Sequence, residues 1–181
     1  MPSRVCAFIS FGANLGDPFT TLSHALEALA ALPETRITAC SSYYRSAPQG
    51  VSSPQPDFIN AVIALDTGLS APALLDALLS IEFDCGRRRT AALAARPIDL
   101  DLLLHGEAVM QSPTLTLPHP RLHQRAFVLL PLAEIAPTLS IPGHGPVSSL
   151  LEKVKDQRIV RVLDIGPKNH ASTTDHSEND L

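Results

Sequence analysis

The sequence predicts an α+β fold in which two helices pack on one face of an antiparallel sheet. Short apolar runs rich in β-forming residues alternate with two segments that carry the spacing and end signals of amphipathic helices. These segments follow one another as β-α-β-β-α-β, the split arrangement of the ferredoxin-like fold. A chain of 181 residues fits a single domain of this kind, with a C-terminal elaboration after the core.

The first strand and the first helix are the best-marked elements. Val5–Phe11 is a short apolar run that ends at a glycine, which favours a buried strand over a helix. Asp17 is the expected N-cap of a helix with Pro18 at its first position, and leucines recur at helical spacing until Pro33 ends it. The chain is therefore expected to begin with a strand followed by a helix.

The rest of the core has two strands, a helix and a strand. The runs Ile37–Tyr44 and Phe58–Asp66 predict the two strands, and the proline-rich loop between them is long for a hairpin, which suggests a function. A second helix is expected from a Ser70 cap to a stop at Gly86. Ile98–His105 predicts the last strand of the core.

The C-terminal elaboration contains further short elements. They are a hairpin around Glu107–Leu117, a helix near Arg125–Ile135, a short helix near Ser148–Lys155 and a strand near Ile159–Leu163. The segment Pro167–Leu181 is polar and almost free of large apolar residues. Residues 1–166 are thus expected to form the domain, and 167–181 a disordered tail.

Composition and charge exclude several classes of protein. The chain is 45% hydrophobic with a net charge of -4, so it has no general attraction for nucleic acid or for an anionic membrane. It contains neither a signal peptide nor an apolar run of about 18 residues, which indicates a cytoplasmic location. Cys6, Cys40 and Cys85 are far apart, so reduced buried thiols are expected rather than disulfides or a zinc site.

Two acidic residues on the predicted strand Ile98–His105 are candidate metal ligands. Strand alternation places Asp99 and Asp101 on one face, and the aliphatic residues 98, 100, 102 and 104 on the other. Carboxylates with Cα atoms roughly 6 to 7 Å apart can converge on hard cations such as magnesium. A polar strand face in plain solvent remains an alternative, although Leu103 continues the acidic face and suggests a cleft.

An arginine cluster precedes this strand. Arg87, Arg88 and Arg89 follow Gly86, and Arg96 lies just before the acids. Guanidinium groups bind phosphate oxygens in a bidentate manner, and a phosphate needs metal on one side and cations on the other. A solvated charge run is the alternative, but the arginines and the acids together favour a phosphate site.

Other polar residues give weaker signals. Glu82 is expected in the last turn of the second helix, where a surface position is the simplest interpretation. His119 and His123 have a spacing that zinc ligands use, but no third ligand is near, and His119 is better interpreted as a hydrogen-bond donor. The chain has no Walker A, dinucleotide-binding or protein-kinase motif.

Taken together, these segments resemble the 6-hydroxymethyl-7,8-dihydropterin pyrophosphokinase family, enzymes of folate biosynthesis, from about Val5 to Leu163. The combination of the acidic strand with its upstream arginines is specific, and the other segments occur in the right order. The matching segments are Gly12–Gly16, Ser41–Arg45 with Pro48, Gln55–Ala61, Ile81–Glu82 with Gly86–Arg89, Arg96 with Ile98–Asp101, Pro118–Pro120, and Arg125 with Phe127.

The resemblance implies that the pterin hydroxymethyl oxygen attacks the β-phosphorus of ATP and releases AMP. It implies that Asp99 and Asp101 hold two Mg²⁺ ions, and that Arg87 and Arg96 stabilise the transferring phosphates. It assigns four residues to ATP binding: Glu82, Arg89, His119 and Arg125. It assigns five residues to pterin binding: Ser46, Pro48, Phe58, Asn60 and Phe127. A monomer is expected.

The chain departs from the family pattern at two places, and its fold class is shared by two other kinds of protein. Family members often carry an Arg-Trp pair where this chain has Thr90–Ala95, and Gln49 stands where an apolar residue is common. An RNA-binding module of the same element order would need basic and aromatic residues on its third strand. Phe58–Asp66 has one aromatic residue and no basic residue. A non-catalytic sensor stays open, although paired acids facing arginines argue against it.

Overall fold

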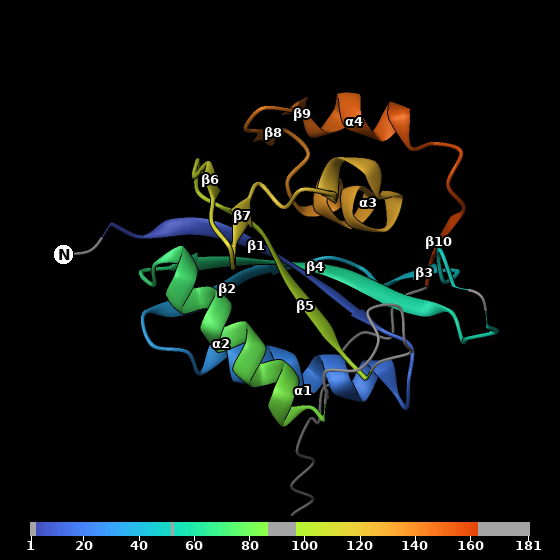
Figure 1. Cartoon of the computed structure of the whole chain (residues 1–181), viewed down its shortest axis with the longest axis horizontal. Helices are drawn as coiled ribbons and strands as arrows, with labels where there is room; N and C mark the ends of the chain where they lie inside the picture. The colour runs from blue at the N-terminus through green and yellow to red at the C-terminus, as the bar shows by residue number, and fades with distance from the viewer. Residues whose placement is uncertain (1–2, 52, 87–96, 163–181) are drawn as a thin grey trace, which may run out of the picture.

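The computed structural model describes residues 3–51, 53–86 and 97–162, and it shows one sheet with helices on both of its faces (Figure 1). Within these residues the main sheet has six strands: β1 (Val5–Ala13), β2 (Thr35–Cys40), β3 (Tyr44–Ser46), β4 (Phe58–Thr67), β5 (Asp99–His105) and β10 (Ile159–Arg161). The order is β10-β3-β4-β1-β5, and β2 also pairs with β4. Every pairing in it is antiparallel, which confirms the predicted α+β fold class.

The two core helices lie on one face of this sheet. In α1 (Pro18–Ala30) the side chain of Asp17 accepts the N–H of Phe19 at 3.1 Å, as expected of an N-cap. In α2 (Ala71–Asp84) the hydroxyl of Ser70 accepts the N–H of Ala73 at 3.3 Å. Gly86 follows α2 with a φ of 90°, a conformation that glycine adopts without strain. Both predicted helices and their end signals are confirmed.

Strand alternation divides the apolar residues between two clusters, one on each face. Ile9 and Phe11 of β1 point to the face of α1 and α2, where Leu22 and Leu74 are fully buried. Phe8 points to the other face, which carries a second cluster. That cluster packs under α3 (Ala126–Ile135) and α4 (Val147–Lys153), the two helices on the opposite side of the sheet (Figure 1).

The prediction of one continuous strand over Ile37–Tyr44 is wrong. The segment forms two strands, β2 and β3, which both pair with β4. Between them the N–H of Ser41 donates to the carbonyl of Val62, while the hydroxyl of Ser41 accepts the N–H of Val62, both at 2.9 Å. The side chain thus takes the place of a backbone acceptor, and the regular ladder is interrupted there.

The predicted face of Leu104 is also wrong. Phe8 lies opposite Leu104 and Ile9 lies opposite Leu102, so Leu103 is an extra residue in the β1–β5 pair. Such a β-bulge reverses the alternation beyond it. Residues 98, 100 and 102 lie on the helix-covered face as predicted, but Leu104 joins Leu103 in the second cluster.

The C-terminal elaboration follows the predicted order. It contains the hairpin β6 (Met110–Gln111) and β7 (Thr116–Leu117), the 3-10 helix Leu122–Gln124, α3, the hairpin β8 (Ser140–Ile141) and β9 (Gly145–Pro146), α4 and β10. The β8–β9 hairpin was not predicted, because two-residue strands carry no periodic signal. Residues 163–181 lie outside the described residues, so the disordered tail stays a prediction.

The structure also tests the expectations about membrane-spanning segments and cysteines. No helix in the described ranges has the length and apolar content to cross a bilayer. All three cysteines are free, but Cys6 and Cys40 are exposed, so the expectation of buried thiols is wrong. Cys6 lies opposite Asp66, which forms ion pairs with Arg4 and Arg36. This end of the sheet is therefore polar.

Candidate active site

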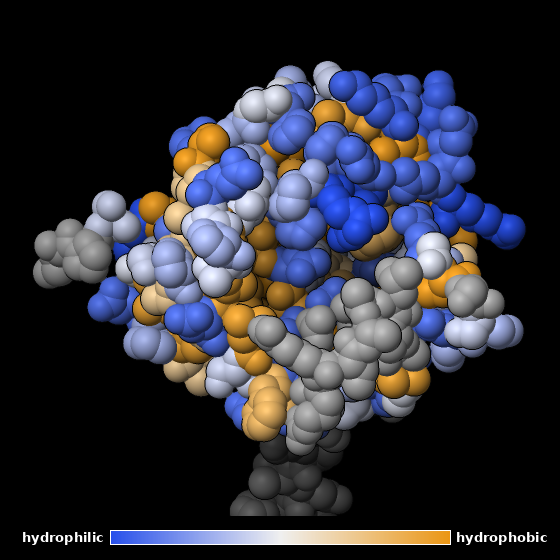
Figure 2. Space-filling view, in the orientation of Figure 1, coloured by the Kyte–Doolittle hydropathy of each residue, from blue (hydrophilic) through white to orange (hydrophobic). Residues whose placement is uncertain are grey.

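The candidate site is a hollow on the sheet face that carries α3 and α4. These helices cover the apolar part of the face and leave its polar part open. The hollow encloses about 780 Å³ of empty space, part of which is open to solvent. In the view of Figure 2 a hollow lies near the middle of the molecule, with hydrophilic residues beside it.

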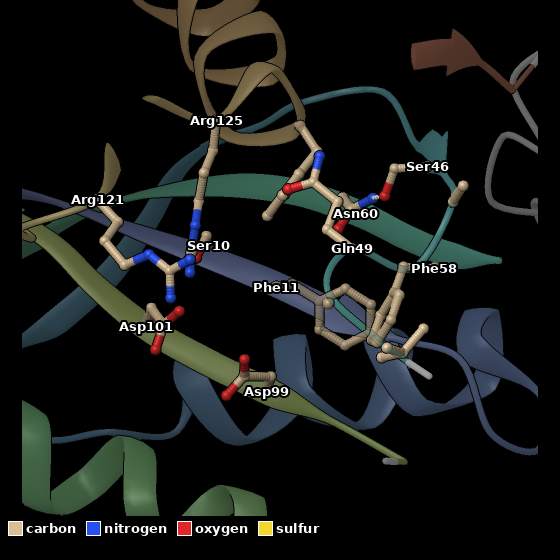
Figure 3. A pocket seen from close by; sticks show the side chains of 14 residues that line it. Ser10, Phe11, Ser46, Gln49, Phe58, Asn60, Asp99, Asp101, Arg121 and Arg125 are labelled. Carbon is tan, nitrogen blue, oxygen red and sulfur yellow. Dashed lines mark hydrogen bonds between the residues drawn. The ribbon is translucent and has the colours of Figure 1, made fainter. Parts of the chain in front are cut away.

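The floor of the pocket carries the acid pair. Asp99 lies opposite Gly12 of β1, and Asp101 lies opposite Ser10, so the predicted shared face is confirmed. Both acids line the pocket, and Figure 3 shows their carboxylates side by side on β5. The side chain of Asp101 is 33% exposed, so it is neither in open solvent nor buried in the core. The two acids therefore lie in a hollow of the sheet, which favours the predicted cleft over a plain solvated strand face.

Two arginines form the wall above the acids. Arg121 and Arg125 flank the 3-10 helix Leu122–Gln124, and both line the pocket. Figure 3 shows the guanidinium group of Arg121 directed toward Asp101 and that of Arg125 directed toward Ser10. Donors of this kind facing carboxylates suit a ligand that carries phosphate groups and divalent cations together. The sequence predicts Arg125 as a site residue, whereas the only signal for Arg121 is its i, i+4 spacing from Arg125.

His119 is fixed beside Asp101 by two hydrogen bonds. Its backbone N–H donates to the carbonyl of Leu103 at 2.9 Å, and its Nδ1 accepts the N–H of Arg121 at 3.2 Å. Because Nδ1 is an acceptor, the ring proton is assigned to Nε2, which lies 3.9 Å from Oδ2 of Asp101. Burial, with Arg125 and Arg121 adding to it against the opposing effect of Asp99, lowers the pKa of His119 to about 4. The imidazole is thus a neutral hydrogen-bond donor at neutral pH.

The other end of the pocket is polar and aromatic. The amide Nδ2 of Asn60 donates to the carbonyl of Tyr44 at 3.1 Å and to the hydroxyl of Ser46 at 2.8 Å. These bonds orient the buried amide, and its Oδ1 lies 3.5 Å from the place where a Cβ on Gly12 would stand. Phe58 lies beside them, and Figure 3 shows this group at the opposite end from Asp101 and Arg121.

Glu82 lies outside the pocket, and the expectation of a surface position is wrong. Its side chain is only 4% exposed, and Oε1 accepts the N–H of Leu100 at 2.6 Å. Leu100 stands between the two acids on β5, so Glu82 holds the backbone of the acidic strand from α2.

The remaining predicted residues fall into three groups. Phe127 lines the pocket with the Cζ of Arg125 5.5 Å from its ring centre, and Pro48 is not among the lining residues. Arg87, Arg89 and Arg96 lie outside the described residues. Seven other lining residues are not among the site residues predicted from the sequence: Ser10, Phe11, Gly12, Ala47, Gln49, Val51 and Arg121.

The pair of carboxylates suits a cation whose other ligands are water molecules and substrate oxygens. Within the described ranges no three His, Cys, Asp or Glu side chains are grouped to hold a metal. Two carboxylates are what Mg²⁺ takes from a protein when phosphate oxygens and water complete its shell. His119 and His123 lie in different surroundings, because the ring of His123 stacks on that of His144 with centroids 4.1 Å apart while His119 faces Asp101.

Comparisons with known proteins identify the family of the chain. The family model described as 7,8-dihydro-6-hydroxymethylpterin-pyrophosphokinase (HPPK) matches residues 8–137. The 2-amino-4-hydroxy-6-hydroxymethyldihydropteridine pyrophosphokinase of Haemophilus influenzae is 39% identical over 158 residues, which cover 87% of this chain and 98% of that protein. The protein of the same name from Pseudomonas aeruginosa is 43% identical over 155 residues, covering 86% and 95%.

A solved structure shows a similar fold. A Plasmodium falciparum HPPK-DHPS has a TM-score of 0.66 at 13% identity, and the match covers 84% of this chain and 46% of that one. At this identity the likeness concerns the fold alone.

Proposed function

The chain belongs to the 7,8-dihydro-6-hydroxymethylpterin-pyrophosphokinase family, and on that premise we propose that its pocket transfers a diphosphate group from ATP to the hydroxymethyl group of 6-hydroxymethyl-7,8-dihydropterin. The product of this step serves folate biosynthesis, and AMP is released. The observation that carries the proposal is the division of one pocket into an acidic and cationic end and an amide and aromatic end. These ends suit the phosphates of ATP and a flat polar heterocycle, respectively.

At the phosphate end, Asp99 and Asp101 would hold two magnesium ions, which neutralise phosphate charge when they are bound. Arg125 and Arg121 point at the same space and would donate hydrogen bonds to phosphate oxygens. His119 would add a neutral N–H donor that does not compete with the acids for charge. Arg87 and Arg96 are proposed to stabilise the transferring group, with Glu82 and Arg89 on the nucleotide side, on the resemblance alone.

At the pterin end, the oriented amide of Asn60 would accept an N–H from the edge of the ring. The hydroxyl of Ser46 accepts from Asn60 and can donate its own proton to a ring nitrogen or oxygen. Phe58 and Phe127 would pack on the faces of the ring, since both line the pocket. Pro48 is proposed as a pterin contact on the resemblance alone.

In the proposed reaction, the hydroxymethyl oxygen forms a bond to the β-phosphorus of ATP and loses its proton to solvent. The bond between the β-phosphorus and the oxygen bridging it to the α-phosphate breaks, and AMP leaves with the electron pair. Charge grows on the bridging oxygen as that bond breaks. The arginines and the N–H of His119 would stabilise this charge, because fixed donors aimed at developing charge lower the barrier.

The experiment that tests the function is product identification. The protein is incubated with ATP, Mg²⁺ and the reduced hydroxymethyl pterin, and the nucleotides are separated and quantified. AMP is expected in equal amount to the pterin diphosphate, with none formed when the pterin is omitted. Predominant ADP would contradict diphosphate transfer, and binding of both ligands without any product would favour the non-catalytic sensor.

Oligomeric state and cellular location are separate proposals. We expect a monomer, which sedimentation with and without ligands would check. A cytoplasmic location follows from the sequence analysis, and fractionation of cells would check it.

A further inference from the structure

We propose that Gln157 is a positioning residue that sets the place of Arg125 in the pocket. The inference rests on the proposed function, because Arg125 matters here as a phosphate-binding group. Gln157 is 32 positions after Arg125 in the chain and belongs to the turn that follows α4, where its own N–H donates to the carbonyl of Val154 at 3.0 Å. It does not line the pocket.

The side-chain amide of Gln157 holds both peptide groups that flank Arg125. Its Oε1 accepts the N–H of Ala126 at 2.9 Å, and its Nε2 donates to the carbonyl of Gln124 at 2.8 Å. The Gln124 carbonyl belongs to the peptide bond before Arg125, and the Ala126 N–H to the one after it. One planar group therefore fixes the backbone on both sides of a single Cα.

The backbone at Arg125 needs these two hydrogen bonds, which we call the Gln157 clamp. Arg125 is extended, with φ -119° and ψ 110°, between the 3-10 helix and the first turn of α3. Ala126 is the first residue of α3, so its N–H has no acceptor within the helix, and Gln157 supplies that acceptor from a distant part of the chain. Ala126 is 1% exposed, and a buried N–H without an acceptor is costly.

The clamp controls function because Arg125 reaches the pocket on a long side chain. A small change in the backbone direction at its Cα moves the guanidinium group away from the space above the acid pair. Misplacement of a binding group by about 1 Å can cost up to 100-fold in rate. Glutamine also suits this task specifically, since one flat group must both donate and accept. Glutamate would still accept from Ala126 but would place an oxygen against the Gln124 carbonyl.

The test is a double-mutant cycle on the full chain. Gln157→Leu is made in the parent protein and in Arg125→Ala, and kcat/KM for ATP is measured for all four proteins. Gln111→Leu, the same chemical change at an exposed glutamine of β6, is the matched control. We expect Gln157→Leu to lower kcat/KM for ATP about tenfold in the parent, less than twofold in Arg125→Ala, and the control to have no effect.

Gln157→Glu provides the second variant if Gln157→Leu fails to fold, and thermal unfolding is recorded for every protein. An equal loss in both backgrounds would overturn the proposal, because Gln157 would then act through general stability. No loss in the parent would overturn it as well.

Failure of the proposed function would be visible separately. If the parent makes no AMP, the same cycle is measured by calorimetric titration with ATP and Mg²⁺. Weaker ATP binding on Gln157→Leu only where Arg125 is present would support the clamp, and any additive result, or no binding by the parent, would reject it.

Discussion

The Nε2 atom of His119 lies 3.9 Å from Oδ2 of Asp101, while Nδ1 of the same ring accepts the N–H of Arg121. Neither contact requires a charged imidazole. Burial and the nearby arginines lower the pKa of His119 to about 4, although Asp99 opposes the shift. The ring is therefore held neutral in the folded protein at pH values where it becomes protonated in the unfolded chain.

This difference predicts a loss of stability in acid that His119→Asn reduces. Between pH 6.5 and about pH 4 the unfolded state binds the proton and the folded state does not. The free energy of unfolding should fall across this window as pH is lowered, with a contribution on the order of 2 to 3 kcal/mol from this ring. Urea unfolding of the metal-free protein at several pH values measures it. Equal pH slopes for parent and variant would refute the assignment.

Asp99→Asn and Asp101→Asn should each reduce turnover by about 100-fold or more, because each removes a charged ligand without changing side-chain size. Stability should change by less than about 0.5 kcal/mol, since both side chains are partly exposed. Turnover as a function of Mg²⁺ concentration and thermal unfolding are measured together. Near-normal turnover in a folded variant would mean that the metal site is misplaced.

Gly12→Ala should weaken binding of the pterin and leave ATP binding unchanged. A methyl group there would stand 3.5 Å from Oδ1 of Asn60 and 4.0 Å from the ring of Phe58, so the protein tolerates it without a clash. It would occupy space between the proposed edge and face contacts of the pterin. We expect KM for the pterin to rise about tenfold or more, in line with one extra methyl group in a pocket. An equal rise in KM for ATP would argue against the division of the pocket.

Glu134→Gln should destabilise the fold. Glu134 of α3 accepts from the Ser42 N–H at 2.9 Å, the Ser42 hydroxyl at 2.8 Å and the Tyr44 hydroxyl at 2.6 Å. An amide cannot accept all three, so a loss of about 1 to 3 kcal/mol is expected at neutral pH. Glu152→Gln, at a 78% exposed side chain, is the matched control and should change little.

Glu134 also makes the stability of the fold depend on pH. Burial acts to raise the pKa of Glu134, but hydrogen bonds from Tyr44 and Ser42, together with Arg161, outweigh it and lower that pKa below 4.5. A carboxyl group with a lowered folded pKa stabilises fully above its unfolded pKa. Its contribution to stability is lost as pH falls below 4.5 toward the pKa of the folded state, and Glu134→Gln should lack this part of the acid transition. If the free energy of unfolding depends on pH in the same way in parent and variant, this prediction is wrong.

Local signals explain what sequence alone could predict. The caps at Asp17 and Ser70 lie within three residues of the N–H groups that they accept, so both partners fall in one short stretch of sequence. The shared face of Asp99 and Asp101 follows from strand alternation over three residues. The two acids and the helices could therefore be placed without knowledge of the tertiary structure.

Long-range partners explain what could not be predicted. The break at Ser41 depends on Val62, and the reversed face of Leu104 depends on the register with Phe8. Gln157 has no motif, because its partners are distant backbone groups. Pairings of this kind leave no period or spacing in the chain.

The bulge residue Leu103 has one more consequence, which concerns a single hydrogen atom. Its carbonyl accepts the N–H of His119, and prolines at 118 and 120 leave this three-residue segment with no other backbone donor. The imidazole is thus attached to β5 through one amide. Replacing that amide with an ester by chemical synthesis would delete the donor while keeping every side chain, and would remove one of the two hydrogen bonds that fix the ring beside the acids.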